Sequence, residues 1–322
     1  MIENTIGIRA VGSFIPKTTK KMVSPSGDHV SIRVATKHET PYKMGADSIL
    51  DMVKKAEVLL EELEGQYFFF NEESYGDYLF QMHGRQIMDI VGVNRITSFN
   101  LLQGGSSSLM LVKLLMNHLI ANTNVRFGIV GSPQSWEYHS QNRQLGNAIL
   151  GDGAASLILE KGYQRNRILS IATKTLGKYH DVLFNEVGGW KSPIADGPCK
   201  EGKFIYKIQN LPHYKEVEES NFLILQNVMG EALQKAHLSF SDISLFAIHS
   251  PTRLHHDRFA KHFEISEEMI IDSAEEYGFM CSAGILLSIG TILENKDLKI
   301  GTKVMVSSFG VDGNWAVMII EI

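Results

Sequence analysis

The stretch Asn100-Leu101-Leu102-Gln103-Gly104-Gly105-Ser106-Ser107-Ser108-Leu109 joins an apolar strand to an apolar helix through two glycines and three serines. A strand that turns sharply into a helix presents the free N–H groups and the positive end of the helix dipole at the junction. Nucleophiles and bound anions often lie at such a place. Residue 105, at the point of the turn, is a glycine and has no side chain. The junction therefore predicts an active site from which one part is missing.

Hydrophobic periodicity predicts the same order of elements twice along the chain. In the first half we expect a strand at 5–11, a polar loop to about 43, a helix at 44–63, a strand at 66–71, a helix at 76–91, a strand at 97–102, a helix at 105–121, and strands at 125–131 and 154–160. In the second half we expect a strand at 167–174, helices at 215–236, 252–263 and 280–293, and strands at 243–249, 269–272, 303–309 and 315–321. The repeated order predicts an α/β protein with two similar layered halves, residues 1–165 and 166–322.

Composition excludes several classes of function. The 322 residues are 44% hydrophobic, which is enough for a sizeable buried core. The net charge is −5 and no dense basic cluster is present, so we expect no nucleic-acid partner. No apolar run approaches the ~18 residues of a membrane span. The two cysteines, Cys199 and Cys281, lack the spacing of a disulfide framework or zinc site. We expect a soluble cytoplasmic protein with no metal and no tightly bound cofactor.

Five short segments fall at predicted strand ends, helix starts and glycine-rich turns. They are 99–107 (FNLLQGGSS), 150–156 (LGDGAAS), 246–250 (FAIHS), 277–283 (YGFMCSA) and 309–315 (FGVDGNW). In this order they resemble the nucleophile turn, the Phe-Gly-Asp-Gly-Ala loop, the histidine strand, the Gly-Asn-Thr-Ser-Ala helix start and the C-terminal glycine loop of the beta-ketoacyl-ACP synthase III family. The resemblance covers nearly the whole chain. It implies the thiolase fold, in which two βαβαβαββ halves form a five-layered αβαβα arrangement.

The resemblance also implies a set of site positions. Members of this family use a Cys-His-Asn set, in which the cysteine takes an acyl group from a thioester and the other two assist condensation with a malonyl group. The cysteine position is Gly105, the histidine position is His249 and the asparagine position is Phe279. Backbone N–H groups of Gly105, Gly310 and Val311 are the expected oxyanion donors. Since glycine cannot form an acyl-enzyme, the substitutions argue against the family's usual condensation.

Three other residues offer alternatives. Ser106 is a candidate replacement nucleophile, with His249 as base and Asp152 behind it, although neighbouring helix residues point about 100° apart, so that Ser106 misses His249 in this register. Cys281 is interpreted as a small buried residue rather than a nucleophile. Arg33 is the only guanidinium in the segment 27–36, where the family holds coenzyme A with a Trp and an Arg. The histidines at 255 and 256 are interpreted as a solvated helix face.

These features leave three functional hypotheses. In the first, the chain is the non-catalytic or substrate-shaping subunit of a heteromeric synthase or acyltransferase in fatty-acid, polyketide or specialised-metabolite biosynthesis. In the second, it transfers an acyl group from a CoA or ACP thioester directly to a small nucleophile, with His249 as general base. In the third, it is a Ser106-dependent thioesterase or hydrolase. Acyl-CoA or acyl-ACP is the expected substrate. A homologous synthase subunit, a second copy of the chain or acyl carrier protein is the expected partner.

Overall fold

Ten strands form one hydrogen-bonded series that consists of two matching sets of five. The structure, a computed structural model, describes residues 5–25, 27–74, 76–78, 81–193 and 205–322, so Cys199 lies outside the described residues. The first set, in spatial order, is β5 (Thr97–Leu101), β4 (Tyr67–Asn71), β6 (Phe127–Gln134), β9 (Gly153–Lys161) and β1 (Ile6–Phe14). The second set is β14 (Ile270–Asp272), β13 (Leu245–Ile248), β15 (Lys303–Phe309), β16 (Asn314–Glu321) and β10 (Arg167–Thr175).

The two sets share the same pairing pattern. In each, the three strands that follow helices are parallel and the last two strands are antiparallel. A single antiparallel pair, Gly7 opposite Arg167, connects β1 to β10 and so joins the two sets. The predicted repeat of elements is therefore confirmed at the level of strand order, while the domain boundary at residue 165 stays a prediction.

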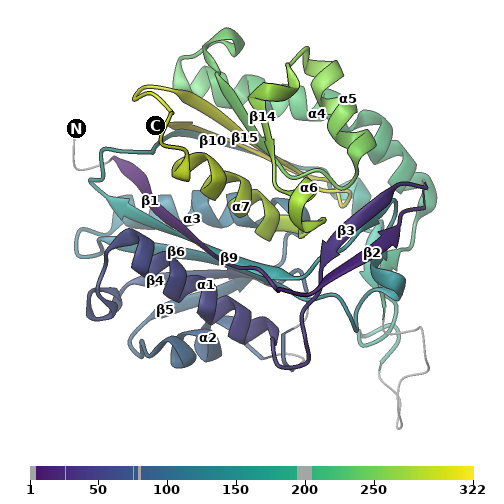
Figure 1. Cartoon of the computed structure of the whole chain (residues 1–322), viewed down its shortest axis with the longest axis horizontal. Helices are drawn as coiled ribbons and strands as arrows, with labels where there is room; N and C mark the ends of the chain where they lie inside the picture. Colours follow the sequence, from purple (N-terminus) through teal and green to yellow (C-terminus); the bar gives the residue numbers. More distant parts are fainter. Residues whose placement is uncertain (1–4, 26, 75, 79–80, 194–204) are drawn as a thin grey trace.

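Seven α-helices in the described residues complete the layers. Helices α1 (Pro41–Ala56) and α2 (His83–Val91) cover the outer face of the first set, and α4 (Leu211–Ala236) and α5 (Arg253–Phe263) cover that of the second (Figure 1). Helices α3 (Ser107–Ala121) and α7 (Cys281–Glu294) lie between the two sets, and α6 (Ala274–Tyr277) is a single turn before α7. This is the expected five-layered αβαβα arrangement, and the fold class is confirmed.

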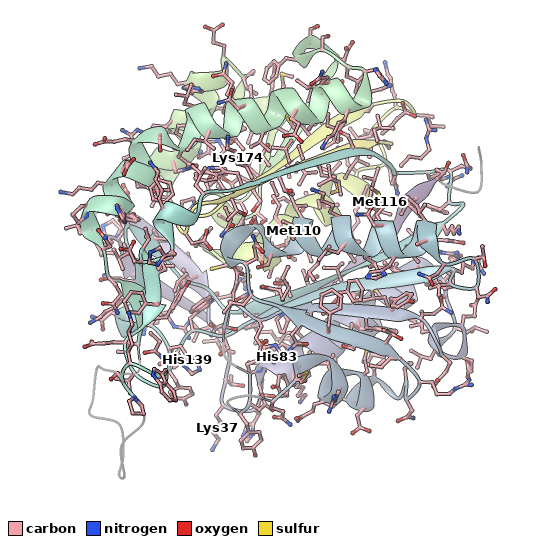
Figure 2. All side chains as sticks on the ribbon, turned by 180° about the vertical axis from the view of Figure 1, so that it is seen from behind. Lys37, His83, Met110, Met116, His139 and Lys174 are labelled. Carbon is pink, nitrogen blue, oxygen red and sulfur yellow. The ribbon has the colours of Figure 1, made fainter. Side chains whose placement is uncertain are left out.

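The central helices are apolar on nearly all sides because sheets cover them from both directions. In α7, the ten residues from Cys281 to Gly290 are all buried. The largest core cluster combines side chains of α3 and α7 with side chains from both strand sets. From behind, Met110 and Met116 are seen along α3 (Figure 2).

Three expectations about the elements are wrong. The helix expected at 76–91 is α2, which begins only at His83. The segment 12–43 is not a plain loop, because it contains the antiparallel hairpin of β2 (Thr19–Val23) and β3 (His29–Arg33). These strands are mostly exposed and polar, so they show no alternation of buried and exposed side chains. Helix α1 ends at Ala56 rather than at 63, because Glu57 adopts a left-handed conformation with φ of 52°.

Four further short strands were also not expected. They form the hairpins of β7 (Gln144–Leu145) with β8 (Ala148–Ile149) and of β11 (Leu183–Asn185) with β12 (Tyr206–Ile208). Strands of two or three residues are too short to give a periodic pattern. In the part of the chain that the structure describes, no helix has both the length and the apolar character needed to cross a bilayer.

A buried ion pair fixes the loop that precedes β9. Both oxygens of Asp152 accept hydrogen bonds from the guanidinium of Arg143, at 2.8 and 2.7 Å, and Asp152 is fully buried. The same carboxylate accepts hydrogen bonds from the backbone N–H groups of Ala35, at 2.8 Å, and Trp136, at 2.9 Å. Asp152 thus ties three separate segments together, which is a structural role.

We predict that Asp152→Asn lowers the free energy of unfolding by about 3 kcal/mol, because it removes the buried one of the two carboxylates that pair with Arg143 and leaves only the half-exposed Glu137. The matched control is Glu231→Gln, which removes a carboxylate from the exposed pair with Lys235 and should cost about 0.5 kcal/mol or less. Urea unfolding followed by circular dichroism measures both values. A loss below about 1 kcal/mol for Asp152→Asn would contradict the role assigned to this pair.

Candidate active site

The strand-to-helix junction is built by two glycines with different roles. Strand β5 ends at Leu101, a 3-10 turn covers Gly104–Ser106, and α3 follows. Gly104 has φ of +60°, and a Cβ atom there would lie 1.3 Å from Oδ2 of Asp312. A Cβ atom at Gly105 would lie 3.4 Å from its nearest heavy atom, the carbonyl oxygen of Phe309, which is an ordinary contact. Packing therefore requires glycine at 104 but leaves space for a side chain at 105.

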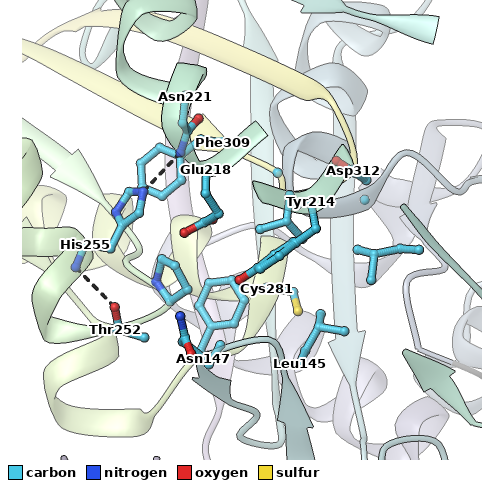
Figure 3. A pocket seen from close by; sticks show the side chains of 18 of the residues that line it. Leu145, Asn147, Tyr214, Glu218, Asn221, Thr252, His255, Cys281, Phe309 and Asp312 are labelled. Carbon is cyan, nitrogen blue, oxygen red and sulfur yellow. Dashed lines mark hydrogen bonds between the residues drawn. The ribbon is translucent and has the colours of Figure 1, made fainter. Parts of the chain in front are cut away.

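Two cavities meet at this junction. The first, which we call the long cavity, is lined by residues of α4 and α5 such as Glu218 and Leu254 and also by Gly105 and Cys281. Figure 3 shows the side chains around it, with Glu218 and Cys281 among those labelled. The second, which we call the polar cavity, extends from Gly104 toward Gln103, Tyr179 and Asn185. Six residues line both cavities: Glu73, Gly104, Trp136, Leu183, Tyr206 and Asp312.

Ser106 lies away from both cavities. Its side chain is 2% exposed, and its hydroxyl donates to the carbonyl oxygen of Gln103 at 3.4 Å. Asp152 is bound by the guanidinium of Arg143, and the ring of His249 contacts Ser273 and the backbone of Met280. The structure therefore does not bring Ser106, His249 and Asp152 together, as the helical register led us to expect.

His249 follows β13 and both of its ring nitrogens are engaged. The backbone N–H of Met280 donates to Nε2 at 2.7 Å, so Nε2 carries no proton. The proton of the neutral ring is then on Nδ1, which lies 2.9 Å from the hydroxyl oxygen of Ser273. That hydroxyl in turn donates to the carbonyl oxygen of Gly284 at 2.8 Å. Burial lowers the pKa of His249 to about 4. The nitrogen that a general base would use is thus already occupied by an amide.

The residues around His249 fit its ring closely. A Cβ atom at Gly284 would lie 2.0 Å from Nε2 of His249, so only glycine allows the ring to occupy this place. The ring of Phe279 stacks on the imidazole, with centroids 5.1 Å apart and an interplanar angle of 15°. Phe279 thus packs where the family resemblance implies a polar amide, and it lines the long cavity.

Cys281 lies at the start of α7 and lines the long cavity, as does Gly105. It is 7% exposed. Burial raises the pKa of its thiol well above the ordinary value, and the neighbouring carboxyl groups of Glu73 and Asp312 raise it further. The thiol is therefore protonated at neutral pH, which opposes a role as nucleophile. The interpretation of Cys281 as a small buried residue agrees with this environment.

The expected oxyanion donors differ in availability. Gly105, Gly310 and Val311 all line the long cavity. The N–H of Gly310 donates to the carbonyl oxygen of Asn314 at 2.9 Å, so it is not free for a ligand. In the described part of the chain, the backbone N–H groups of Gly105 and Val311 donate to no protein acceptor. Two of the three predicted donors thus face the cavity region without a protein partner.

Arg33 does not serve the cavities as expected. Its guanidinium carbon lies 5.8 Å from the centroid of the Tyr277 ring, and Arg33 lines neither the long nor the polar cavity. Its carbonyl oxygen accepts a hydrogen bond from the N–H of Asp152 at 2.9 Å. The contact with coenzyme A that was expected of Arg33 therefore has no counterpart in the geometry of these two cavities.

The interpretation of the two histidines of α5 as solvated is wrong, since His255 is 7% and His256 is 4% exposed. The indole N–H of Trp315 donates to Oδ1 of Asn221, so the amide nitrogen of Asn221 faces Nε2 of His255, at 3.1 Å. Burial lowers the pKa of His255 to about 3. His256 instead lies 3.0 Å from Asp272, and this hydrogen bond raises its pKa.

Two carboxylic acids at the junction of the cavities were missed by sequence analysis. Burial raises the pKa of Glu73 to about 7 and that of Asp312 to about 6. Glu73 comes just after the apolar strand β4, at the carboxyl end of a parallel strand, where ligands usually bind in α/β folds. That position was the signal that could have identified it. The described residues contain no group of three or more potential metal ligands at this or any other place.

Comparisons with known proteins agree with the fold. Residues 233–322 match the family described as 3-oxoacyl-[acyl-carrier-protein (ACP)] synthase III C terminal. The chain is 23% identical to the beta-ketoacyl-[acyl-carrier-protein] synthase III of Fusobacterium nucleatum, over 95% of each chain. It superposes on the 3-oxoacyl-[acyl-carrier-protein] synthase III of Aquifex aeolicus with a TM-score of 0.80 and 14% identity, covering 98% and 100% of the two chains. It superposes on a Xanthomonas campestris OleA variant, solved with lauric acid and lauroyl-CoA, with a TM-score of 0.81 and 13% identity, covering 99% of each chain.

We predict that the ring of His249 stays neutral, with its proton on Nδ1, from pH 8 down to about pH 5. Because its pKa in the folded state lies below that in the unfolded state, His249 contributes stability that is present above about pH 6.5 and lost as the pH falls toward 4. Nitrogen NMR of the imidazole, assigned with a His249→Gln variant, reports both the tautomer and the titration. A titration midpoint near 6.5 would mean that the ring is accessible and able to act as a base.

Proposed function

We propose that this chain, which is similar to beta-ketoacyl-ACP synthase III over nearly its whole length, binds an acyl thioester without forming an acyl-enzyme at residue 105. It acts as the substrate-binding and substrate-shaping subunit of a heteromeric synthase or acyltransferase. The long cavity receives the pantetheine arm, which CoA and acyl carrier protein have in common. The acyl carbonyl group then lies next to Gly105.

The observation that carries this proposal is the combination of an open cavity with an absent nucleophile. The long cavity reaches Gly105, and a side chain would fit there, yet none is present. At the inner end, the indole nitrogen of Trp136 and Oδ1 of Asp312 are buried without a hydrogen-bond partner in the described residues. Buried polar groups without partners are costly, and a bound ligand can satisfy them. These features support binding rather than covalent catalysis at residue 105.

The edge of the strand series supports a subunit role. Strand β5 is at the end of the series, so one side of it presents unpaired backbone groups that can pair with another chain. Leu102, which follows β5 and lines the polar cavity, is 68% exposed. Met110 and Met116, on the helix that follows, are only partly buried (Figure 2). A partner bound at this edge would cover apolar side chains and enclose the polar cavity.

The two alternatives receive less support from the geometry. A direct acyl transfer that relies on His249 conflicts with the amide of Met280 bound to Nε2. A hydrolase that relies on Ser106 conflicts with the burial of that hydroxyl away from both cavities. Neither residue is in a position to contact a thioester in the long cavity.

We predict that Gly105→Cys, made in a Cys281→Ser background, becomes acylated when incubated with acyl-CoA, whereas the wild-type chain does not. The new thiol would lie at the inner end of the long cavity, where the structure leaves space for it. Intact-mass spectrometry detects the added acyl group. Ser106→Cys in the same background is the matched control, and it should stay unmodified because residue 106 faces neither cavity. Equal acylation of both variants, or an adduct on the wild-type chain, would refute the placement of the thioester.

We predict that Leu102→Asp weakens association with a synthase III-type partner from the same organism by at least tenfold, because it places a charge at the β5 edge. Co-expression followed by sedimentation velocity measures the association. Ile300→Asp is the control, because Ile300 is 97% exposed on a loop that lines neither cavity. If both variants associate as the wild type does, or if the wild-type chain forms a stable homodimer and ignores the synthase, the subunit proposal fails.

A further inference from the structure

We propose that Glu73 is an acid–base residue at the junction of the two cavities and that it promotes direct transfer of the acyl group from the bound thioester to a small primary amine. This inference rests on the proposed function, since it needs a thioester in the long cavity. It assigns the proton transfer to a residue outside the Cys-His-Asn positions. It also assigns an acceptor to the polar cavity.

The two oxygens of the Glu73 carboxyl group have different surroundings. Four hydrogen bonds converge on Oε2, from the side-chain nitrogens of Asn71 and Gln134, at 3.0 Å each, and from the N–H and hydroxyl of Ser282, at 3.0 and 2.6 Å. Within the described residues no donor contacts Oε1, and this oxygen is not among the buried atoms that lack a partner. One oxygen is therefore anchored while the other is open to the cavities that Glu73 lines.

The anchor fixes the position of the carboxyl group. Ser282 is the second residue of α7, a helix of 14 residues, so its N–H is one of the helix's free donors. The carbonyl oxygen of Ser282 accepts a hydrogen bond from Ser108 of α3 at 2.9 Å. Glu73 is thus held between β4 and the two central helices. Such fixed placement is what a proton-transfer group requires.

The surroundings of Glu73 also suit proton exchange near neutral pH. The titratable groups that face it are Asp312, from the loop between β15 and β16, and Cys281 of α7, with Glu72 next to it in the chain. Burial raises the pKa of Glu73 most, its hydrogen bonds to Ser282 lower it, and Asp312 raises it again. With a pKa of about 7, the carboxyl group can both accept and release a proton under ordinary conditions.

The charge of the polar cavity indicates the kind of acceptor. Three carboxyl groups line it, those of Glu72, Glu73 and Asp312, and the residues that line it include no lysine or arginine. Oδ1 of Asp312 is buried without a partner in the described residues. The only basic side chains in this lining are those of two histidines, His139 and His180, and burial lowers the pKa of His139 to about 4. Three carboxyl groups in such a lining favour a ligand that arrives as a cation and donates hydrogen bonds. A small primary amine has both properties, whereas an alcohol lacks the charge.

The reaction balances without a further reagent. The amine binds as an ammonium ion, and loss of one proton to a carboxylate of the polar cavity leaves a nucleophilic nitrogen. That nitrogen forms a bond to the thioester carbonyl carbon, and Oε1 of Glu73 takes the second proton that the nitrogen loses. The carbon–sulfur bond breaks, and the leaving sulfur takes up the proton from Glu73. The products are an amide and the free thiol of the pantetheine carrier.

If residue 73 served only to cap the N-terminus of α7, it would need neither an ionisable group nor a second oxygen open to the cavities. A glutamine at position 73 would still accept the four hydrogen bonds through its amide oxygen and would not place a second carboxyl group beside Asp312. The pKa of Glu73 is higher in the folded chain than in the unfolded chain, so the unfolded chain loses this proton first as the pH rises. The contribution of Glu73 to the free energy of unfolding therefore falls between about pH 4.5 and pH 7. Glu73→Gln should therefore be at least as stable as the wild type at pH 8, and it is the matched isosteric variant.

The test measures release of free thiol from acyl-pantetheine thioesters of two to eight carbons, with ethanolamine as the probe amine and ethylene glycol as the matched alcohol. We expect amine-dependent thiol release with formation of the N-acyl product, and little release with the alcohol. Glu73→Gln should lower the rate by about 10²–10⁴-fold. In this variant the rate of thiol release should no longer change with pH near 7. Loss of a merely structural contact would lower the rate without removing this pH dependence. Glu231→Gln, on the outer surface, should behave as the wild type.

Thioester binding, measured separately by calorimetry, distinguishes failure of this inference from failure of the proposed function. If the wild type binds the thioester but releases no thiol with ethanolamine, or if Glu73→Gln retains the wild-type rate and pH profile, the acid–base role of Glu73 is refuted while thioester binding stands. If the wild type does not bind the thioester, the proposed function itself fails. Release that is equal with the alcohol would refute the amine assignment.

Discussion

The close contact between Gly104 and the carboxyl group of Asp312 determines the arrangement of the whole site. Because residue 104 has no side chain, the loop between β15 and β16 can approach the strand-to-helix turn, and Asp312 fits against it. This contact brings a residue near the end of the chain next to a turn that lies two hundred residues earlier. It also places Asp312 near Glu73, so that the two cavities meet at a pair of acids. A side chain at 104 would displace the carboxyl group of Asp312, and the φ of +60° would strain any residue other than glycine.

The turn, the strand and the loop that form the site are those that the five motifs predict, but the side chains at the motif positions differ in chemistry from those that the resemblance implies. The turn at Gly104–Ser106, the strand that carries His249 and the loop at Gly310 all lie where the five motifs imply. On this framework, His249 has become part of a hydrogen-bonded core with Ser273 and Met280. The carboxyl groups that line both cavities are instead those of Glu73 and Asp312. In the reaction that we propose, the binding framework and the chemistry depend on different residues.

Sequence reasoning predicted the fold well because the fold depends on periodicity and element order. The sixteen elements of the two repeats were predicted from their apolar patterns. Among the described residues, the exposed hairpin of β2 and β3, the hairpins of very short strands, the single turn α6 and the 3-10 turns were missed. Among site residues, the positions of Gly105, His249 and Phe279 were found because motifs mark them. The tautomer of His249 could not be predicted from the sequence, because it depends on the backbone N–H of Met280, 31 residues away.

The remaining misses have a similar cause. Glu73 belongs to none of the five motifs, and Asp312 lies in the glycine loop at 309–315 but was not singled out there. The raised pKa values of both arise from burial that only the folded chain produces. The histidines of α5 were misjudged because two polar residues in sequence indicate a solvated face unless long-range partners such as Asn221 and Asp272 exist. Local sequence carries little information about contacts of this range.

The fit between Gly284 and the His249 ring has an evolutionary consequence. The two residues are 35 positions apart, yet the absence of a side chain at 284 is what makes room for the imidazole. A methyl group at 284 is excluded while the ring is present, and loss of the ring leaves a hole that a larger residue at 284 would fill. Related chains should therefore exchange these two residues jointly, and a lineage that gives up the histidine should also lose the glycine.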